Sequence, residues 1–153
     1  MLKKKPKVLA IASGGGHWIQ LLRLRPAFEG CKVVYVSTHE GYHNQVHGSV
    51  FHSVTDANRW NKLKLIKMAF EVLLIIIKEN PDIVISTGAA PGLVAIFLGN
   101  LVRKKTLWID SIANVERISL SGRLAKPFSG LHITQWEHLA DGIKTFYKGN
   151  VIS

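Results

Sequence analysis

Residues 8–22 read VLAIASGGGHWIQLL, an apolar run that three consecutive glycines join to an amphipathic segment. The apolar run predicts a buried strand, and the spacing of apolar residues after His17 predicts a helix. Glycines have no Cβ, so their N–H groups can approach a ligand closely, and a helix start carries about half a positive charge. The stretch predicts the first turn of a βαβ unit with a phosphate-bearing ligand; a tight turn without any ligand is the alternative.

Length and composition describe one globular domain. The chain has 153 residues, of which 47% are hydrophobic and 20% are charged. The single Cys31 permits no internal disulfide, and the basic segment 1–6 precedes an apolar run too short for a secretory signal. We therefore expect a cytoplasmic protein with a basic N-terminal tail. The net charge of +10 favours an anionic partner, such as nucleic acid, a membrane surface or a phosphorylated substrate.

Strands and helices alternate along the whole chain. Predicted strands span residues 8–12, 32–37, 50–54, 82–86, 106–109, 131–134 and 145–147. Predicted helices span 17–28, 60–78, 91–102 and 121–128, and a polar loop spans 38–47. Continuous apolar runs such as residues 83–85 are typical of parallel strands that helices cover on both faces. The pattern predicts one Rossmann-like α/β domain with a doubly wound parallel sheet.

A second turn of small residues reinforces the first. Residues 86–92 read STGAAPG and lead from the apolar run at 83–85 into a predicted helix. Ligands of open α/β sheets bind where the strand order reverses, so we expect the first and fourth strands to flank one cleft. The dinucleotide fingerprint is incomplete because Ile19 stands at its last glycine position, and no Gly-Lys-Ser or Gly-Lys-Thr sequence forms a P-loop. These departures argue against NAD and ATP, and no tightly bound cofactor is predicted.

Four segments are informative because of their order along the chain. They are SGGGH at 13–17, PDIVISTG at 81–88, DSIANVERISLSGR at 110–123 and QWE at 135–137. In this order and spacing they resemble a glycosyltransferase subunit family over nearly the whole chain. That family contains the acceptor-site subunit of the split UDP-N-acetylglucosamine transferase of dolichol-linked oligosaccharide assembly, and bacterial counterparts in capsule and exopolysaccharide synthesis. The resemblance implies the N-terminal half of a two-domain GT-B enzyme, related to the transferase that forms the lipid-linked peptidoglycan precursor.

The resemblance also implies a reaction and a partner. A hexosyl or N-acetylhexosaminyl group would pass from a UDP-sugar, the donor substrate, to a polyprenyl-diphosphate-linked sugar. A separate donor-binding glycosyltransferase subunit would hold the UDP-sugar. Because a site between two domains is incomplete in one of them, we predict that this chain alone lacks transferase activity. Two alternatives remain: a non-catalytic scaffold that recruits and activates a partner glycosyltransferase subunit, and an autonomous nucleotide-sugar enzyme.

The resemblance places roles on residues at the predicted turns. A general base must take the acceptor proton; His17 is the candidate and Glu116 the competitor. The alternatives are a capping role for His17 and a structural ion pair of Glu116 with Arg117. Acceptor or phosphate binding is expected of Gly14, Gly15, Gly16, Thr87, Gly88, Ser111, Asn114 and Arg117. Contact with a sugar or with the partner is expected of Gln135, Trp136 and Glu137; a core position for Trp136 is the alternative.

Membrane contact depends on the predicted helix 60–78. No stretch reaches the roughly 18–20 apolar residues that span a bilayer. On a helical wheel three lysines and Glu71 share an arc of about 60°, and two apolar residues flank it. Such a helix, with the basic tail, can lie on an anionic leaflet; a core helix with one solvated stripe is the alternative. The resemblance favours peripheral association with the inner face of the plasma membrane. The expected contacts are Lys64, Lys67, Leu74, Ile75 and Lys78.

Two further patterns point to no function. His39, His43 and His47 recur at four-residue intervals, but Gly41 and Gly48 argue against a helix there, so no metal site is predicted. The basic residues are scattered over several elements and match no nucleic-acid-binding module. No nucleic-acid partner is predicted.

Overall fold

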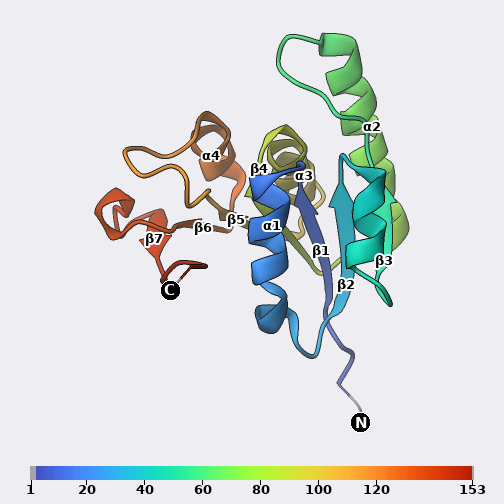
Figure 1. Cartoon of the computed structure of the whole chain (residues 1–153), viewed down its shortest axis with the longest axis horizontal. Coiled ribbons are helices and arrows are strands. Elements are labelled where there is room, and N and C mark those ends of the chain that lie inside the picture. Colours follow the sequence, from blue (N-terminus) through green and yellow to red (C-terminus); the bar gives the residue numbers. More distant parts are fainter. Residues whose placement is uncertain (1–2, 153) are drawn as a thin grey trace.

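Seven parallel strands form one sheet, and the computed structural model describes residues 3–152 of the chain (Figure 1). The strands are β1 Lys7–Ala12, β2 Lys32–Ser37, β3 Val50–Ser53, β4 Ile83–Gly88, β5 Lys105–Ile109, β6 Leu131–Thr134 and β7 Thr145–Tyr147. Their order in the sheet is β3-β2-β1-β4-β5-β6-β7. The order reverses between β1 and β4, which confirms that the first and fourth strands flank the switch point.

Helices cover both faces of this sheet, which confirms the doubly wound arrangement. The α-helices are α1 Gly16–Arg23, α2 Lys62–Glu79, α3 Ala90–Leu101 and α4 Leu120–Ala125. Short 3₁₀ helices are η1 Arg25–Phe28, η2 Glu40–Gln45, η3 Lys126–Phe128 and η4 Glu137–Leu139. One core cluster joins α1 to its face of the sheet, and another joins α2 and α3 to the opposite face.

The first helix is shorter than predicted. The expected helix 17–28 ends at Arg23, and residues 25–28 form the separate η1. Pro26 explains the break, because proline lacks an N–H donor and its ring clashes with the preceding helical turn. The predicted polar loop 38–47 contains η2, whose first turn is capped by His39 accepting a hydrogen bond from the Gly41 N–H at 3.1 Å.

Helix α2 has an unexpected orientation. It begins at Lys62, where the Asn61 side chain accepts a hydrogen bond from the Lys64 N–H. Its buried face includes Ile75, which is 9% exposed and belongs to the core. The prediction that Ile75 contacts a membrane is therefore wrong. Leu74 is 49% exposed and stays available.

The basic tail predicted for residues 1–6 is only partly within the described chain. Residues 1 and 2 lie outside the described residues, whereas Lys3, Lys4, Lys5 and Pro6 are exposed and lead into β1.

Helix α3 packs unusually close to the sheet. A Cβ on Gly92 would lie 1.8 Å from Ser86 Oγ, so only glycine permits this approach of α3 to β4. The close packing puts the start of α3 directly behind the end of β4, at the switch point.

A buried histidine on β6 connects α4 to β7. His132 is 1% exposed; its Nε2 is 2.9 Å from the Gly122 carbonyl oxygen and its Nδ1 is 3.1 Å from Thr145 Oγ1. Because the carbonyl can only accept, the ring proton is on Nε2 and Nδ1 accepts from the hydroxyl. Burial lowers the pKa of His132 below its ordinary value.

We predict that protonation of His132 destabilises the fold. Since its folded pKa is lowered, its contribution is present above the ordinary value of 6.5 and is lost as the pH falls through the folded pKa. Urea unfolding of the wild type and of His132→Gln between pH 7 and pH 5 checks this, and the variant should show the weaker loss of stability. The exposed His47→Gln is the matched control; an equal flattening in both variants contradicts the prediction.

Candidate functional site

A small cavity lies beyond the carboxyl ends of β4 and β5. Its volume is about 190 Å³. The lining residues are His17, Thr87, Gly88, Ala89, Trp108, Asp110, Ser111, Ala113, Asn114, Ser119 and Ser121. Five of them were predicted site residues, from three segments of the chain: His17, Thr87, Gly88, Ser111 and Asn114. The fold thus brings the first two glycine-containing turns and the loop after β5 to one place.

Reciprocal hydrogen bonds connect His17 to the end of β4. The Nδ1 of His17 is 2.9 Å from the Thr87 carbonyl oxygen, and Thr87 Oγ1 donates to the His17 carbonyl oxygen at 2.7 Å. A carbonyl oxygen only accepts, so this contact places the ring proton on Nδ1. The lone pair of the imidazole is then on Nε2.

Gly88 makes room for this ring. A Cβ at Gly88 would lie 2.6 Å from His17 Nδ1, and the residue has a φ of +121°. Both facts require glycine. The Gly88 N–H donates to Ser86 Oγ at 3.0 Å, and its carbonyl oxygen accepts from the Ser13 N–H at 2.9 Å. The two turns are therefore bonded directly to one another.

The glycine turn itself differs from the prediction. The Gly14 N–H donates to Thr38 Oγ1 at 3.3 Å, and the Gly15 N–H donates to Tyr42 Oη at 2.9 Å. The expectation that three glycine N–H groups face a phosphate is therefore wrong for Gly14 and Gly15. Gly16 is exposed at the start of α1, and its contact with a phosphate stays a prediction.

An aromatic stack holds the segment that contains Thr38 and Tyr42, whose hydroxyls accept these two hydrogen bonds. Tyr42 stacks on the buried Trp18 with ring centroids 4.8 Å apart, and His39 stacks on Tyr42 at the same separation. Trp18 Nε1 also donates to Gln45 Oε1 at 2.9 Å. The sequence analysis did not predict this aromatic stack, because the apolar residues of 38–47 do not recur at the spacing of an amphipathic helix.

The loop after β5 is held by residues from distant segments. Gln20 of α1 accepts from the Ile112 N–H at 3.0 Å, and Trp136 Nε1 donates to the Ile112 carbonyl oxygen at 2.8 Å. Gln135 is 2% exposed; its Nε2 donates to the Asp110 carbonyl oxygen and its Oε1 accepts from the Val151 N–H. Both ends of its amide are used, so Gln135 has a structural role and offers no group to a sugar.

Glu137 is exposed and Trp136 half-buried, so contact of these two residues with a sugar or a partner stays a prediction.

The competing base lies in a neighbouring hollow. Glu116 and Arg117 are exposed and line a depression of about 360 Å³, which shares Ala113 and Asn114 with the His17 cavity. Within residues 3–152 neither Glu116 nor Arg117 forms an ion pair. The structural pair considered from the sequence is therefore not formed.

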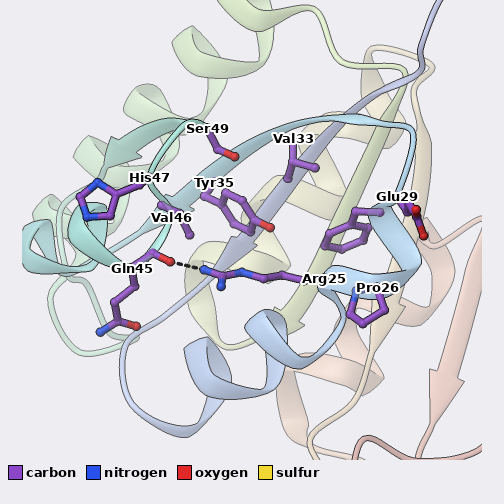
Figure 2. A pocket seen from close by; sticks show the side chains of 10 residues that line it. Arg25, Pro26, Glu29, Val33, Tyr35, Gln45, Val46, His47 and Ser49 are labelled. Carbon is purple, nitrogen blue, oxygen red and sulfur yellow. Dashed lines mark hydrogen bonds between the residues drawn. The ribbon is translucent and has the colours of Figure 1, made fainter.

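A larger hollow contains none of the predicted site residues. It measures about 710 Å³ and lies between η1, β2 and the segment after η2 (Figure 2). The Arg25 guanidinium spans it and donates to the Gln45 carbonyl oxygen. Burial raises the pKa of the Tyr35 hydroxyl, and the nearby Arg25 opposes that shift. The Arg25–Gln45 hydrogen bond connects η1 to the end of η2. Because the larger hollow contains none of the predicted site residues, the 190 Å³ cavity remains the candidate site.

The histidines at positions 39, 43 and 47 do not gather at one point. His39 stacks on Tyr42, whereas His43 packs against His47 and Phe51. In the described part of the chain no group of three or more His, Cys, Asp or Glu residues is arranged to hold a metal ion.

Comparison with known families finds one match over most of the chain. The family described as "Oligosaccharide biosynthesis protein Alg14 like" matches residues 44–151. A UDP-N-acetylglucosamine transferase subunit ALG14 from Yarrowia lipolytica is 24% identical over 164 residues, covering 89% of this chain and 76% of that protein. The Eremothecium gossypii ALG14 subunit is 36% identical over 67 residues, but this match covers only 40% of the chain and 30% of the relative.

Solved structures show the same fold. MurG from Acinetobacter baumannii superposes with a TM-score of 0.76 at 14% identity, covering 95% of this chain and 46% of MurG. A UDP-GlcNAc 2-epimerase from Methanocaldococcus jannaschii, in complex with UDP-GlcNAc and UDP, gives a TM-score of 0.71 at 15% identity and covers 94% and 46%. The chain thus has the Rossmann-like fold of the N-terminal half of a GT-B protein and spans about half the length of these proteins.

We predict that Gly88→Ala displaces His17. The added Cβ meets the ring, and the backbone is strained at positive φ, so the variant should lose more than about 1 kcal/mol of stability. Urea unfolding measures the loss, and imidazole ¹⁵N shifts report whether the proton stays on Nδ1.

Gly142→Ala is the matched control, because Gly142 has a φ of +67° but no atom within 4 Å of an added Cβ. It should show backbone strain without any change in the His17 shifts. An unchanged His17 ring in Gly88→Ala would contradict the prediction.

Proposed function

The chain belongs to the family of Alg14-like oligosaccharide biosynthesis proteins, and from this we propose that it is the acceptor-site subunit of a heteromeric glycosyltransferase. The proposed reaction transfers a sugar from a UDP-sugar to a hydroxyl of a polyprenyl-diphosphate-linked saccharide. The naming of relatives as subunits of a UDP-N-acetylglucosamine transferase supports this proposal. The setting would be capsule or exopolysaccharide synthesis at the inner face of the plasma membrane.

The observation that carries the proposal is the orientation of His17. Its Nδ1 is bound to the Thr87 carbonyl oxygen at 2.9 Å, so Nε2 is the nitrogen that can act as a base. In the proposed step Nε2 takes the proton from the acceptor hydroxyl while its oxygen attacks the anomeric carbon. The bond from that carbon to the diphosphate oxygen breaks, and UDP leaves.

The chemistry of the cavity supports a neutral sugar as its occupant. No Lys or Arg lines it, whereas Ser111, Asn114 and Ser121 supply hydroxyl and amide groups. The carboxylate of Asp110 would repel a phosphate there. A volume of about 190 Å³ is smaller than the roughly 300–1,000 Å³ of drug-sized ligand sites, so a single ring is the expected content.

The acceptor diphosphate would then lie outside the cavity. Gly16 at the start of α1 and the exposed Arg117 are the groups left to bind it. Glu116 shares the hollow of Arg117 and keeps its place as the competing base.

In this proposal a separate donor-binding subunit holds the UDP-sugar. The naming of curated relatives as transferase subunits supports such a partner. The chain without that subunit would then be inactive.

Helix α2 offers the surface for membrane contact. Five apolar side chains on its outer side are each at least 49% exposed: Leu63, Ile66, Phe70, Leu74 and Ile77. On a helical wheel they share an arc of about 80°, and the lysines at positions 64, 67 and 78 lie beside it. We call these five residues the α2 ridge. None of the helices in residues 3–152 has the length and hydropathy that a bilayer span requires.

The direction of α2 relates this ridge to the cavity. The helix runs back from the carboxyl edge of the sheet, and its amino end projects beyond that edge (Figure 1). A bilayer that receives the α2 ridge, with lysines meeting anionic headgroups, would therefore approach the cavity edge. A lipid-linked acceptor could then reach the site while its chain stays in the membrane.

Removal of the base tests the proposed chemistry. In a complex co-purified with the donor-binding subunit, His17→Ala should reduce kcat by about 10²–10⁴-fold for transfer to a polyprenyl-diphosphate-linked sugar. Glu116→Gln distinguishes the competing base, and the exposed His47→Ala is the matched control.

Full turnover by both His17→Ala and Glu116→Gln would leave a non-catalytic scaffold as the function. Turnover by the chain without its partner would overturn the subunit proposal and favour an autonomous enzyme.

Membrane contact is tested by vesicle binding. Because each large apolar side chain contributes roughly 1.5–3 kcal/mol when fully buried, Ile66→Ser with Phe70→Ser should weaken partition to anionic phospholipid vesicles at least about tenfold. Ile143→Ser is the matched control, since Ile143 is 82% exposed on a different surface. Equal binding by wild type and the double variant would refute a role for the α2 ridge.

A further inference from the structure

A buried carboxylate lies in the wall of the cavity, and the proposed chemistry does not use it. Asp110 follows β5 directly and is 1% exposed. Within residues 3–152 no Lys or Arg forms an ion pair with it. Burying an unpaired charge is costly unless hydrogen bonds replace its water. Its partners therefore reveal what it does.

Both oxygens of Asp110 are fully engaged. Oδ1 accepts from Trp108 Nε1 at 3.1 Å and from Ser119 Oγ at 2.5 Å. Oδ2 accepts from Asn114 Nδ2 at 3.1 Å and from the Ser119 N–H at 3.0 Å. These four donors occupy the lone pairs of both oxygens, so the carboxylate offers no free acceptor site to a substrate.

Two of these partners, Asn114 and Ser119, belong to one loop, whereas Trp108 lies on β5. Asn114 is near the start of the 111–119 loop, and Ser119 ends it as the N-cap of α4, where Ser119 Oγ also accepts from the Gly122 N–H at 2.9 Å. A Cβ on Gly122 would lie 2.5 Å from Asp110 Oδ1, so α4 closes tightly over the carboxylate. One side chain thus connects the strand, the loop and the following helix.

The same loop carries the proposed acceptor contacts. Ser111 and Asn114 line the cavity with His17, and Glu116 and Arg117 line the adjacent hollow. The backbone of Asp110 is held from the opposite side, since Gln135 Nε2 donates to its carbonyl oxygen at 2.9 Å. Asp110 thus holds the loop through its side chain, and its own carbonyl oxygen is held by Gln135.

We propose that Asp110 is a positioning residue for the acceptor: its carboxylate holds the 111–119 loop so that Ser111 and Asn114 face His17 across the cavity. This inference rests on the proposed function for its kinetic consequence, but the order of the loop is measurable without it. The carboxylate acts by accepting four hydrogen bonds, so an amide of the same shape cannot replace it. In Asp110→Asn, one NH₂ group must face donors that the carboxylate oxygen accepted from.

Hydrogen exchange of the chain itself tests the placement of the loop. In Asp110→Asn the amides of residues 111–119 should exchange at least about tenfold faster than in the wild type, while amides of β1 and β4 keep their protection. Unchanged exchange in the loop overturns the proposal, whatever the chain catalyses. If Asp110→Asn fails to fold, Ser119→Ala removes only the 2.5 Å contact and the cap, and should accelerate exchange in the same loop.

Kinetics of the complex with the donor-binding subunit test the consequence. Asp110→Asn should raise KM for a polyprenyl-diphosphate-linked sugar about tenfold or more and leave KM for the UDP-sugar within about twofold. A parallel rise of both constants, or no rise in the acceptor KM, overturns the positioning role. Absence of turnover in the wild type would instead refute the proposed function, and the exchange result would still decide the role of Asp110 in the loop.

The matched control is another carboxylate that organises a loop. Asp141 Oδ1 accepts from the N–H groups of Ile143, Lys144 and Thr145, and its Oδ2 binds Lys126 Nζ at 2.6 Å, outside the cavity. Asp141→Asn should loosen its own turn without changing the acceptor KM. The same acceptor KM increase in both variants would show a general loss of stability and would overturn the specific role of Asp110.

Discussion

Two hydrogen bonds between His17 and Thr87 determine the arrangement of the site. They join the first turn of α1 to the end of β4, at the one place where the strand order reverses. The contact is possible only because Gly88 leaves space for the imidazole ring. The same contact assigns the ring proton to Nδ1 and leaves the lone pair on Nε2. One hydrogen bond between two elements therefore also sets the tautomer of the proposed base.

The cavity beside His17 and the surface around it differ in polarity. Hydroxyls, an amide and a buried carboxylate line the cavity, whereas Arg117 and the free end of α1 lie outside it. This division favours an uncharged ring inside and an anionic group at the rim. The α2 ridge adds an apolar surface whose helix projects at the same edge of the sheet. Ring, diphosphate and lipid would thus meet surfaces of matching chemistry in that order.

The predictions from sequence were wrong for two kinds of group. One is a backbone N–H that can bind either a ligand or another part of the chain, and the other is a helix face that can meet either the sheet or solvent. The glycine N–H groups were expected to bind a ligand, but Gly14 and Gly15 donate to Thr38 and Tyr42. No local pattern shows that a segment more than twenty residues away will fold back, stacked on Trp18. Ile75 was placed on the wrong side of α2, because a helical wheel gives relative angles and the sheet decides which angle is buried. Gln135 and Asp110 likewise acquired their roles through contacts between distant segments.

The sequence by itself determined the alternation of strands and helices, the parallel sheet and the two turns beside the switch point. Those features follow from local periodicity, glycine positions and the covering of strands on both faces, which neighbouring residues encode. Only the tertiary structure decided which hydrogen-bonding groups stay free, which carboxylate is buried and which side of α2 meets solvent. Each of these depends on a contact with a residue that is distant in the sequence, and the local sequence does not show which distant residues become neighbours.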